Sequence, residues 1–168
     1  ENLMVVLNSV HVPLKDAILS LNESNLIETV EITDRWYRKN FGKQPQIILA
    51  ALNPHAGEQG RMGLEDATII TPAVDQLRAD GIDATGPHPA DTLFHEDARK
   101  TYDVVLGMYH DQVLIPLKTL DFFGGVNITL GLDFIRTSPD HGTGFDIADK
   151  GIAQCQSMIE AIKTANDL

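Results

Sequence analysis

The chain has 168 residues, of which 43% are hydrophobic and 22% are charged, so its composition excludes disordered and collagen-like proteins and predicts one globular domain over residues 1–168. Thirteen Lys and Arg residues against 24 Asp and Glu residues give a net charge of −11, which excludes nucleic acids and anionic membrane surfaces as partners. No apolar run approaches the ~18 residues that a membrane-spanning helix needs, so we expect a soluble protein.

Short apolar runs predict strands at residues 3–7, 47–52, 104–108 and 126–130, with a further strand near residues 134–136. Their apolar residues are continuous rather than alternating, which is typical of strands that are covered on both faces. The first run begins at residue 3 of a chain that does not start with Met. We therefore expect the sequence to be a piece of a longer protein.

Helical periodicity occupies the intervals between these strands. One pattern covers residues 26–41 and stops at Gly42, a second stops at Gly81, and a third covers residues 152–162. Strands alternating with helices predict an α/β fold with a mainly parallel sheet and helices on both faces. Cys155 lies in the third pattern and is expected in the core. As the single cysteine it cannot form an internal disulfide, which fits the reducing cytoplasm.

Three histidines follow three predicted strands: His11 the first, His55 the second and His110 the third. Ligands of parallel α/β sheets bind at the carboxyl ends of the strands, so these side chains are expected at one edge of the sheet. Three imidazoles with an open fourth position describe a catalytic metal site. The alternative is that each is a loop histidine bonded to the backbone. We interpret His95, beside two acidic residues, as a helix-start or surface residue.

Further polar residues lie close to these strand ends or inside apolar segments. Asp111 adjoins His110 and is interpreted as a helix N-cap, a carboxylate behind the metal ligand or a substrate contact. Lys118, Asn127 and Arg136 interrupt apolar segments. The two cations are suited to bind a dianion such as a phosphate monoester, and the alternative is that they are solvated surface side chains.

Six motifs are similar to those of the 4-hydroxythreonine-4-phosphate dehydrogenases of vitamin B6 biosynthesis, and the resemblance extends over essentially the whole chain. The motifs are HVPLKD (11–16), NPHAGE (53–58), PADT (89–92), MYHDQ (108–112), GVNITLGL (125–132) and IRTSPDHGT (135–143). The resemblance implies a cytoplasmic oxidoreductase that oxidises and decarboxylates its substrate.

The resemblance also implies a metal site shared within a homodimer. In it His11, His55 and His110 bind a divalent ion, with His110 supplied by the second chain. Zinc is favoured by the imidazole ligands, and magnesium, manganese or cobalt are the alternatives.

The same resemblance implies the substrate contacts. Lys118, Asn127 and Arg136 contact a small phosphorylated substrate, while Asp91 and Asp111 line the site. Lys118 and Asp111 are the candidates for the proton acceptor.

The family has the isocitrate and isopropylmalate dehydrogenase-like fold, whose adenosine-binding loop has a His-Gly-Ser/Thr start and an Asp-Ile-Ala end. The residues that match this pattern are His141, Gly142, Thr143, Asp146, Ile147 and Ala148, which implies that the loop binds NAD or NADP. Three positions elsewhere in the chain or next to this loop depart from the family's usual sequence, in which small residues or Pro are expected: Val113, Asp133 and Asp149.

Members of the family are about twice as long as this chain, which resembles their C-terminal half. We expect an N-terminal lobe to be absent from the 168 residues, which alone are expected to be inactive. Two other functions stay open. One is a related dehydrogenase of a phosphorylated sugar acid or a dihydrodiol carboxylate. The other is a metal-binding dimerisation fragment without turnover.

Overall fold

The structure, a computed structural model, describes residues 3–168 and contains two compact units, which divide between Pro116 and Leu117. Helix α5 (His110–Leu120) continues through the division and carries Pro116 in its interior. None of the helices in the described residues is long and apolar enough to cross a membrane.

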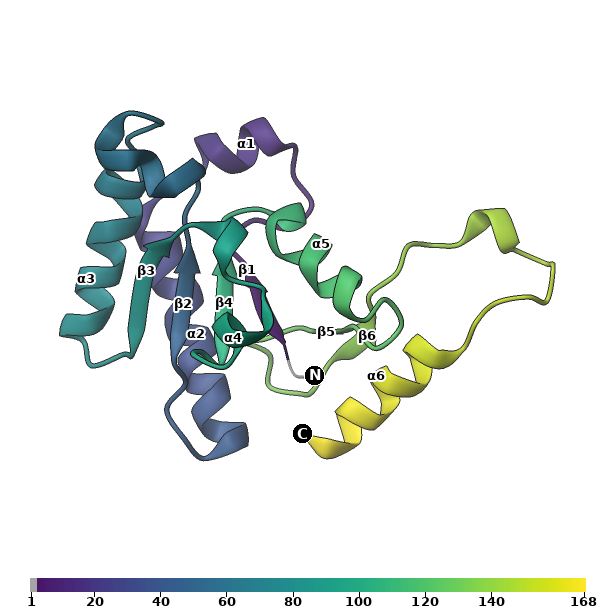
Figure 1. Cartoon of the computed structure of the whole chain (residues 1–168). Coiled ribbons are helices and arrows are strands. Elements are labelled where there is room, and N and C mark those ends of the chain that lie inside the picture. The colour runs from purple at the N-terminus through teal and green to yellow at the C-terminus, as the bar shows by residue number, and fades with distance from the viewer. Residues whose placement is uncertain (1–2) are drawn as a thin grey trace. The chain divides into compact units, whose positions relative to one another are not determined.

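The first unit contains a sheet of four parallel strands in the order β1-β4-β2-β3 (Figure 1). The strands are β1 (Met4–Leu7), β2 (Ile47–Ala50), β3 (Ala84–His88) and β4 (Val104–Gly107). In the register, Val104 of β4 lies opposite Met4 of β1 on one side and Ile47 of β2 on the other. The carboxyl ends of β1, β4 and β2 are therefore neighbours at one edge.

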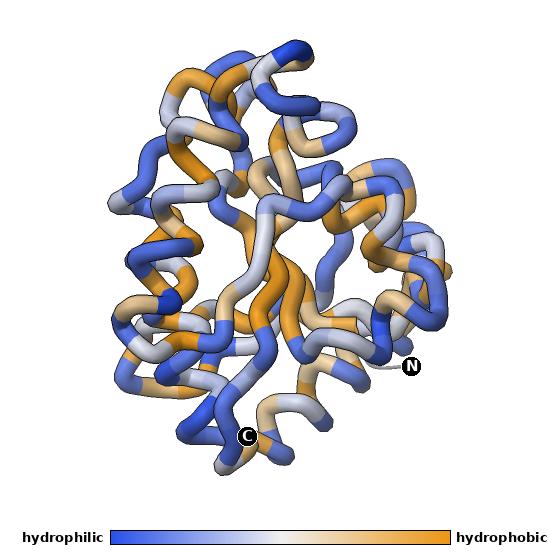
Figure 2. Tube along the Cα trace, turned by 60° about the vertical axis from the view of Figure 1, so that its left-hand side comes forward, coloured by the Kyte–Doolittle hydropathy of each residue, from blue (hydrophilic) through white to orange (hydrophobic). Residues whose placement is uncertain are grey.

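Two apolar clusters cover the two faces of this sheet. Leu49 and Leu106 point into one cluster with Leu26 and Leu77 of helices α2 (Glu23–Phe41) and α3 (Thr71–Ala79). The alternate strand residues, among them Val105, pack on the other face with the segment around the short helix α4 (Glu96–Arg99). The central strands are orange in the hydropathy colouring of Figure 2. Each fully buried Leu or Val stabilises the fold by ~1.5–3 kcal/mol, so this unit has a substantial core.

Local signals explain where the long helix begins and ends. The Asn22 side chain accepts a hydrogen bond from the backbone N–H of Asn25 at 2.9 Å, which caps α2. Gly42 follows the helix with φ +67°, the left-handed geometry that a glycine adopts without a steric penalty. Four short elements also lie between the strands: α1 (Leu14–Leu19), the 3-10 segment Pro54–Gly60, the π-helical turn Asp66–Ile70 and the 3-10 turn Ala90–Thr92.

The second unit contains the antiparallel pair β5 (Val126–Ile128) and β6 (Thr137–Pro139), with helix α6 (Gln156–Asp167) packed on it. The Thr137 hydroxyl donates to the carbonyl of Ala161 at 2.8 Å and fixes the helix to the strands. Between β6 and α6 the chain has one 3-10 turn, Phe145–Ile147.

The α/β fold with a mainly parallel sheet is confirmed, and three details differ from the sequence expectation. Strand β3 was missed because its sequence, ATGPH, contains Gly and Pro, which an edge strand tolerates. Strand β6 lies three residues later than expected. Helix α6 begins at Gln156, so Cys155 lies outside its periodic face and is exposed, and the expectation of a core cysteine was wrong.

Candidate functional site

Hydrogen bonds join the loops that leave neighbouring strands at the carboxyl edge of the sheet. The backbone N–H of Asn8 donates to the carbonyl of Gly107 at 2.9 Å, and the Ser9 hydroxyl donates to the carbonyl of Met108 at the same distance. The loop after β1 is thus fixed against the end of β4. This places His11, in the loop after β1, close to His110, the first residue of α5.

The imidazole rings of His11 and His110 lie side by side in one chain. Their centroids are 5.4 Å apart and the ring planes are tilted by 44°. Both rings line a cavity of about 260 Å³, together with Ser9, Tyr109 and Asp111. Two neighbouring imidazoles at a strand-end cavity suit a divalent metal of the zinc class.

Asp111 orients His110. Its Oδ1 lies 2.7 Å from Nδ1 of the His110 ring, and because a carboxylate only accepts hydrogen bonds, Nδ1 carries the proton. The remaining nitrogen, Nε2, is then free to bind a metal. Of the three interpretations of Asp111, this contact favours the carboxylate behind a ligand over the helix N-cap, since Asp111 lies inside α5.

Gln112 connects two strand ends, a role that the sequence did not reveal. Its side-chain oxygen accepts a hydrogen bond from the N–H of Met108 at 2.7 Å, and its side-chain nitrogen donates to the carbonyl of Ala51 at 2.7 Å. The exits of β4 and β2 are therefore held together by one amide. The only sequence signal was an amide residue two positions after His110.

His55 lies in a turn with unusual backbone geometry and is not grouped with the other two histidines. Residues 55–59 all have left-handed dihedral angles, with φ between +41° and +74°. Within residues 3–168 no group of three His, Cys, Asp or Glu side chains is arranged to hold a metal ion. One chain therefore brings together His11 and His110, whereas the family resemblance implies that His11 and His55 belong to one chain and that His110 is supplied by the second.

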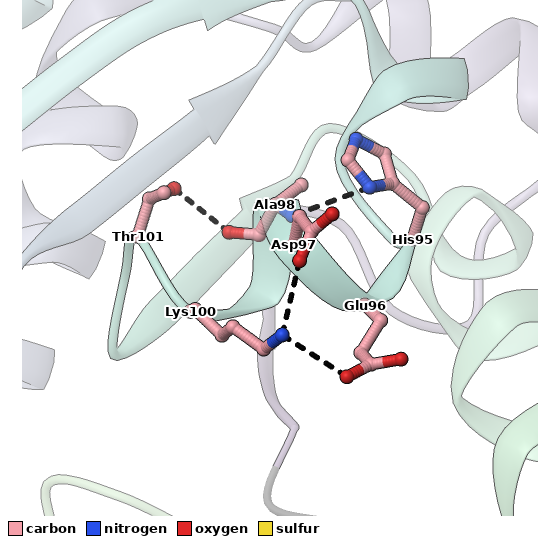
Figure 3. Close-up of polar contacts among 6 residues, drawn as sticks. All are labelled: His95, Glu96, Asp97, Ala98, Lys100 and Thr101. Carbon is pink, nitrogen blue, oxygen red and sulfur yellow. Dashed lines mark hydrogen bonds and ion pairs between the residues drawn. The ribbon is translucent and has the colours of Figure 1, made fainter.

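The other polar candidates of the first unit lie in different surroundings. Asp91 is exposed in the 3-10 turn Ala90–Thr92 and does not line the cavity. His95 caps α4, since its Nδ1 accepts a hydrogen bond from the N–H of Ala98 at 3.3 Å (Figure 3). The adjacent Lys100 lies 3.0 Å from both Asp97 and Glu96, and these contacts raise the pKa of its ammonium group. The role of His95 as a helix-start residue is confirmed.

The three expected phosphate contacts all lie in the second unit. The Lys118 ammonium is 3.4 Å from Oδ2 of Asp140, and Arg136 donates to the Thr129 hydroxyl at 2.7 Å. Asn127 is exposed in β5. Arg136 is exposed as well, so its guanidinium is accessible to an anion.

The expected cofactor loop is an exposed segment around the 3-10 turn Phe145–Ile147. The ring nitrogen Nδ1 of His141 lies 2.8 Å from the carbonyl of Gly142, so it carries a proton there. Gly144 has φ +62°, which lets the chain turn before Phe145, whose side chain is 83% exposed. The same segment contains Thr143, Asp146 and Ile147. The apolar surface of Phe145 is available to a flat ligand.

Comparisons with known proteins agree with this architecture. The family described as pyridoxal phosphate biosynthetic protein PdxA matches residues 1–165. A 4-hydroxythreonine-4-phosphate dehydrogenase from Caulobacter vibrioides is 56% identical over 165 residues, which are 98% of this chain and 50% of that protein. The chain spans about half the length of the curated relatives it matches.

Two solved structures are similar to this chain in fold as well as in sequence. The crystal structure of 4-hydroxythreonine-4-phosphate dehydrogenase from Klebsiella pneumoniae matches with a TM-score of 0.90 at 46% identity, over 98% of this chain and 50% of that one. A terephthalate 1,2-cis-dihydrodiol dehydrogenase from Burkholderia xenovorans matches with a TM-score of 0.78 at 30% identity, over 98% and 52% of the respective chains. With the family match over nearly its whole length, the chain belongs to the family of the pyridoxal phosphate biosynthetic protein PdxA.

Proposed function

We propose that this chain is part of an oxidoreductase of vitamin B6 biosynthesis that oxidises and decarboxylates 4-hydroxythreonine 4-phosphate, with NAD or NADP as the hydride acceptor and a bound divalent metal. The names of the relatives support the proposed substrate. The main support for a bound metal is the pair of imidazole rings, His11 and His110, at the strand-end cavity. The reducing cytoplasm is the proposed location.

His11 and His110 supply two imidazoles to the metal, and His55 of a second copy supplies the third in a homodimer. His55 is exposed and lies outside the His11–His110 pair, which supports a role toward another chain. When bound, the ion would supply a positive charge that lowers the pKa of the substrate hydroxyl, and the dinucleotide would supply the hydride acceptor. Zinc suits the imidazole ligands best, and magnesium, manganese and cobalt are the substitutes to assay.

The remaining roles belong to side chains of this chain. Lys118, Arg136 and Asn127 bind the substrate phosphate, and Lys118 or Asp111 accepts the hydroxyl proton. Asp111 lines the site, whereas Asp91 lies outside the cavity of this chain. The loop of residues 141–147 binds the adenosine of the cofactor. The net charge of −11 repels a dianion, so directed hydrogen bonds from the two cations must provide the affinity.

The test replaces Arg136 in the full-length protein. Arg136→Met is expected to raise KM for the phosphorylated substrate about 10-fold or more, because a charge-assisted hydrogen bond contributes ~1.5–3 kcal/mol. Metal content should not change, since a guanidinium is not a metal ligand. Lys100→Met, which removes an exposed lysine paired with Glu96, is the matched control. An unchanged kcat/KM in Arg136→Met contradicts the phosphate assignment.

The dihydrodiol dehydrogenase among the structural matches favours one second candidate, oxidation of a dihydrodiol carboxylate or a related sugar acid. Turnover of such a substrate above that of the phosphorylated one, by the full-length protein, would establish it. A fragment without turnover is the other candidate, and hydride transfer by the 168-residue chain alone would exclude it.

A further inference from the structure

The turn that carries His55 adopts a conformation that its sequence does not favour. Residues 55–59 form a left-handed turn in which four of the five residues have a Cβ atom: His55, Ala56, Glu58 and Gln59. In the left-handed region Cβ lies too close to the following carbonyl, so a run of such residues persists only where the surrounding structure holds it.

A buried carboxylate holds the entrance of this turn. Asp66 is 1% exposed. Its Oδ1 accepts a hydrogen bond from the N–H of Leu52 at 2.8 Å, and its Oδ2 accepts from the N–H of Asn53 at 3.2 Å and from the Asn53 side chain at 2.8 Å. Both carboxylate oxygens therefore bind the backbone that leads from β2 to His55. The Asn53 side chain also donates to Glu65 at 2.9 Å, which fixes the amide from a second side.

The turn packs directly on the same carboxylate. A Cβ atom at the buried Gly57 would lie 3.3 Å from Oδ2 of Asp66 and 3.0 Å from the carbonyl oxygen of Gly63. The carbonyl of Gly57 accepts a hydrogen bond from the N–H of Met62 at 3.1 Å, which closes the turn. Asp66 thus binds the entrance of the turn and leaves little room for a side chain at its middle.

We propose that Asp66 is a positioning residue that fixes the left-handed turn and thereby presents the His55 imidazole to the metal. Asp66 lies 11 positions after His55 in the sequence, outside the six motifs that carry the family resemblance. It contacts the strand exit and the turn rather than the imidazole. The part of the inference that concerns metal rests on the proposed metal site, whereas the part that concerns the turn does not.

The first experiment measures the turn without metal. In Asp66→Asn the amide of Met62 should exchange with solvent at least 10-fold faster, because one carboxylate oxygen becomes an amide group that repels the N–H donors. This amide reports on the turn because it donates to the carbonyl of Gly57 and not to Asp66. Asp34→Asn is the matched control: Asp34 is also buried and binds Arg38 within α2. It should lower the thermal midpoint and leave the Met62 amide unchanged.

The second experiment measures metal affinity by titration with zinc and with cobalt, whose absorption spectrum reports coordination. Asp66→Asn should weaken binding about 10–100-fold, as is typical when a group supporting a ligand is removed. In the His55→Ala background it should have no further effect on metal affinity. Ala56→Gly should restore part of the affinity lost in Asp66→Asn, because glycine adopts the left-handed region without penalty.

The outcomes separate this inference from the proposed function. Unchanged Met62 exchange in Asp66→Asn overturns the inference, and so does unchanged metal affinity in a wild type that binds metal. A wild type that binds no metal overturns the proposed function, while the exchange experiment still decides the role of Asp66 in the turn. If Asp66→Asn does not fold, Asn53→Ala removes one of the three donors and is judged by the same two measurements.

Discussion

The two units of the chain differ in how much apolar surface they bury. In the first, side chains on both faces of the sheet are almost inaccessible, with Leu49 at 0% exposure on one face and Val105 at 0% on the other. In the second, among the described residues, Phe134 is 67% exposed, Phe145 83% and Ile162 63%. A two-stranded sheet with one helix is too small to bury these groups, which are typical of a surface that another part of the protein covers.

This difference separates the proposed roles. His11 and His110 follow strand ends that hydrogen bonds hold together at the edge of a packed sheet, which suits a metal site that must be formed before substrate binds. The proposed phosphate and adenosine contacts lie on the thinly packed unit. We therefore expect the metal ligands to be ordered in the chain alone and the second unit to be stabilised by binding.

The largest expected effect comes from comparing one apolar truncation in each unit. Leu49→Ala should lower the free energy of unfolding by ~2–5 kcal/mol, because it removes a fully buried side chain and leaves a cavity. Phe134→Ala should change it by less than ~0.5 kcal/mol in the 168-residue chain. Urea denaturation of both variants measures this. Equal losses would contradict the contrast between the units.

The next largest expected effect is a loss of stability at a close contact in the first unit. A Cβ atom on Gly107 would lie 2.5 Å from Cγ1 of the buried Val113, one of the positions that depart from the family pattern. Gly107→Ala should therefore destabilise the chain by ~1–3 kcal/mol through overpacking. Adding Val113→Ala should recover part of that loss. If the losses of the two single variants simply add, the contact does not cause the destabilisation.

The first unit also contains a pH-dependent contact. Burial raises the pKa of Asp103, but hydrogen bonds from Lys43, the N–H of Gln46 and the Tyr37 hydroxyl outweigh it and hold the pKa below the ordinary 3.8. A carboxyl with a depressed folded pKa stabilises the fold above its unfolded pKa. That stability is lost as the pH falls through the unfolded and then the folded value.

Asp103→Asn should accordingly reduce the dependence of the urea midpoint on pH below about 4. Asp97→Asn, which changes an exposed carboxylate on α4, is the control and should leave the dependence almost as in wild type. A wild-type slope in Asp103→Asn would show that the contact does not contribute.

The smallest effect concerns the second unit. Asp149, another departure from the family pattern, has φ +61°, where glycine is favoured over residues with a Cβ atom. Asp149→Gly should relieve this strain and raise the free energy of unfolding by ~0.5 kcal/mol, the gain being limited by the greater freedom of glycine when unfolded. Differential scanning calorimetry measures the shift. A decrease would mean that the Asp149 side chain stabilises its loop.

Sequence patterns predicted the elements that depend on local chemistry. The periodic face of residues 26–41 and the stop at Gly42 correspond to α2, and three apolar runs correspond to β1, β2 and β4 of the four-stranded sheet. The pairing of His11 and His110 follows from topology, because their strands are neighbours. The left-handed turn at His55 has no comparable signal: only one of its five residues is glycine, and the turn depends on the distant Asp66.

The proposed metal site combines His11 and His110 of one chain with His55 of a second chain. Mixed dimers of His55→Ala and His11→Ala chains test it directly, because one of the two shared sites then keeps all three ligands. We predict one zinc per mixed dimer, and none in mixed dimers of His11→Ala and His110→Ala chains. Zinc bound by the second mixture and not by the first would contradict the claim.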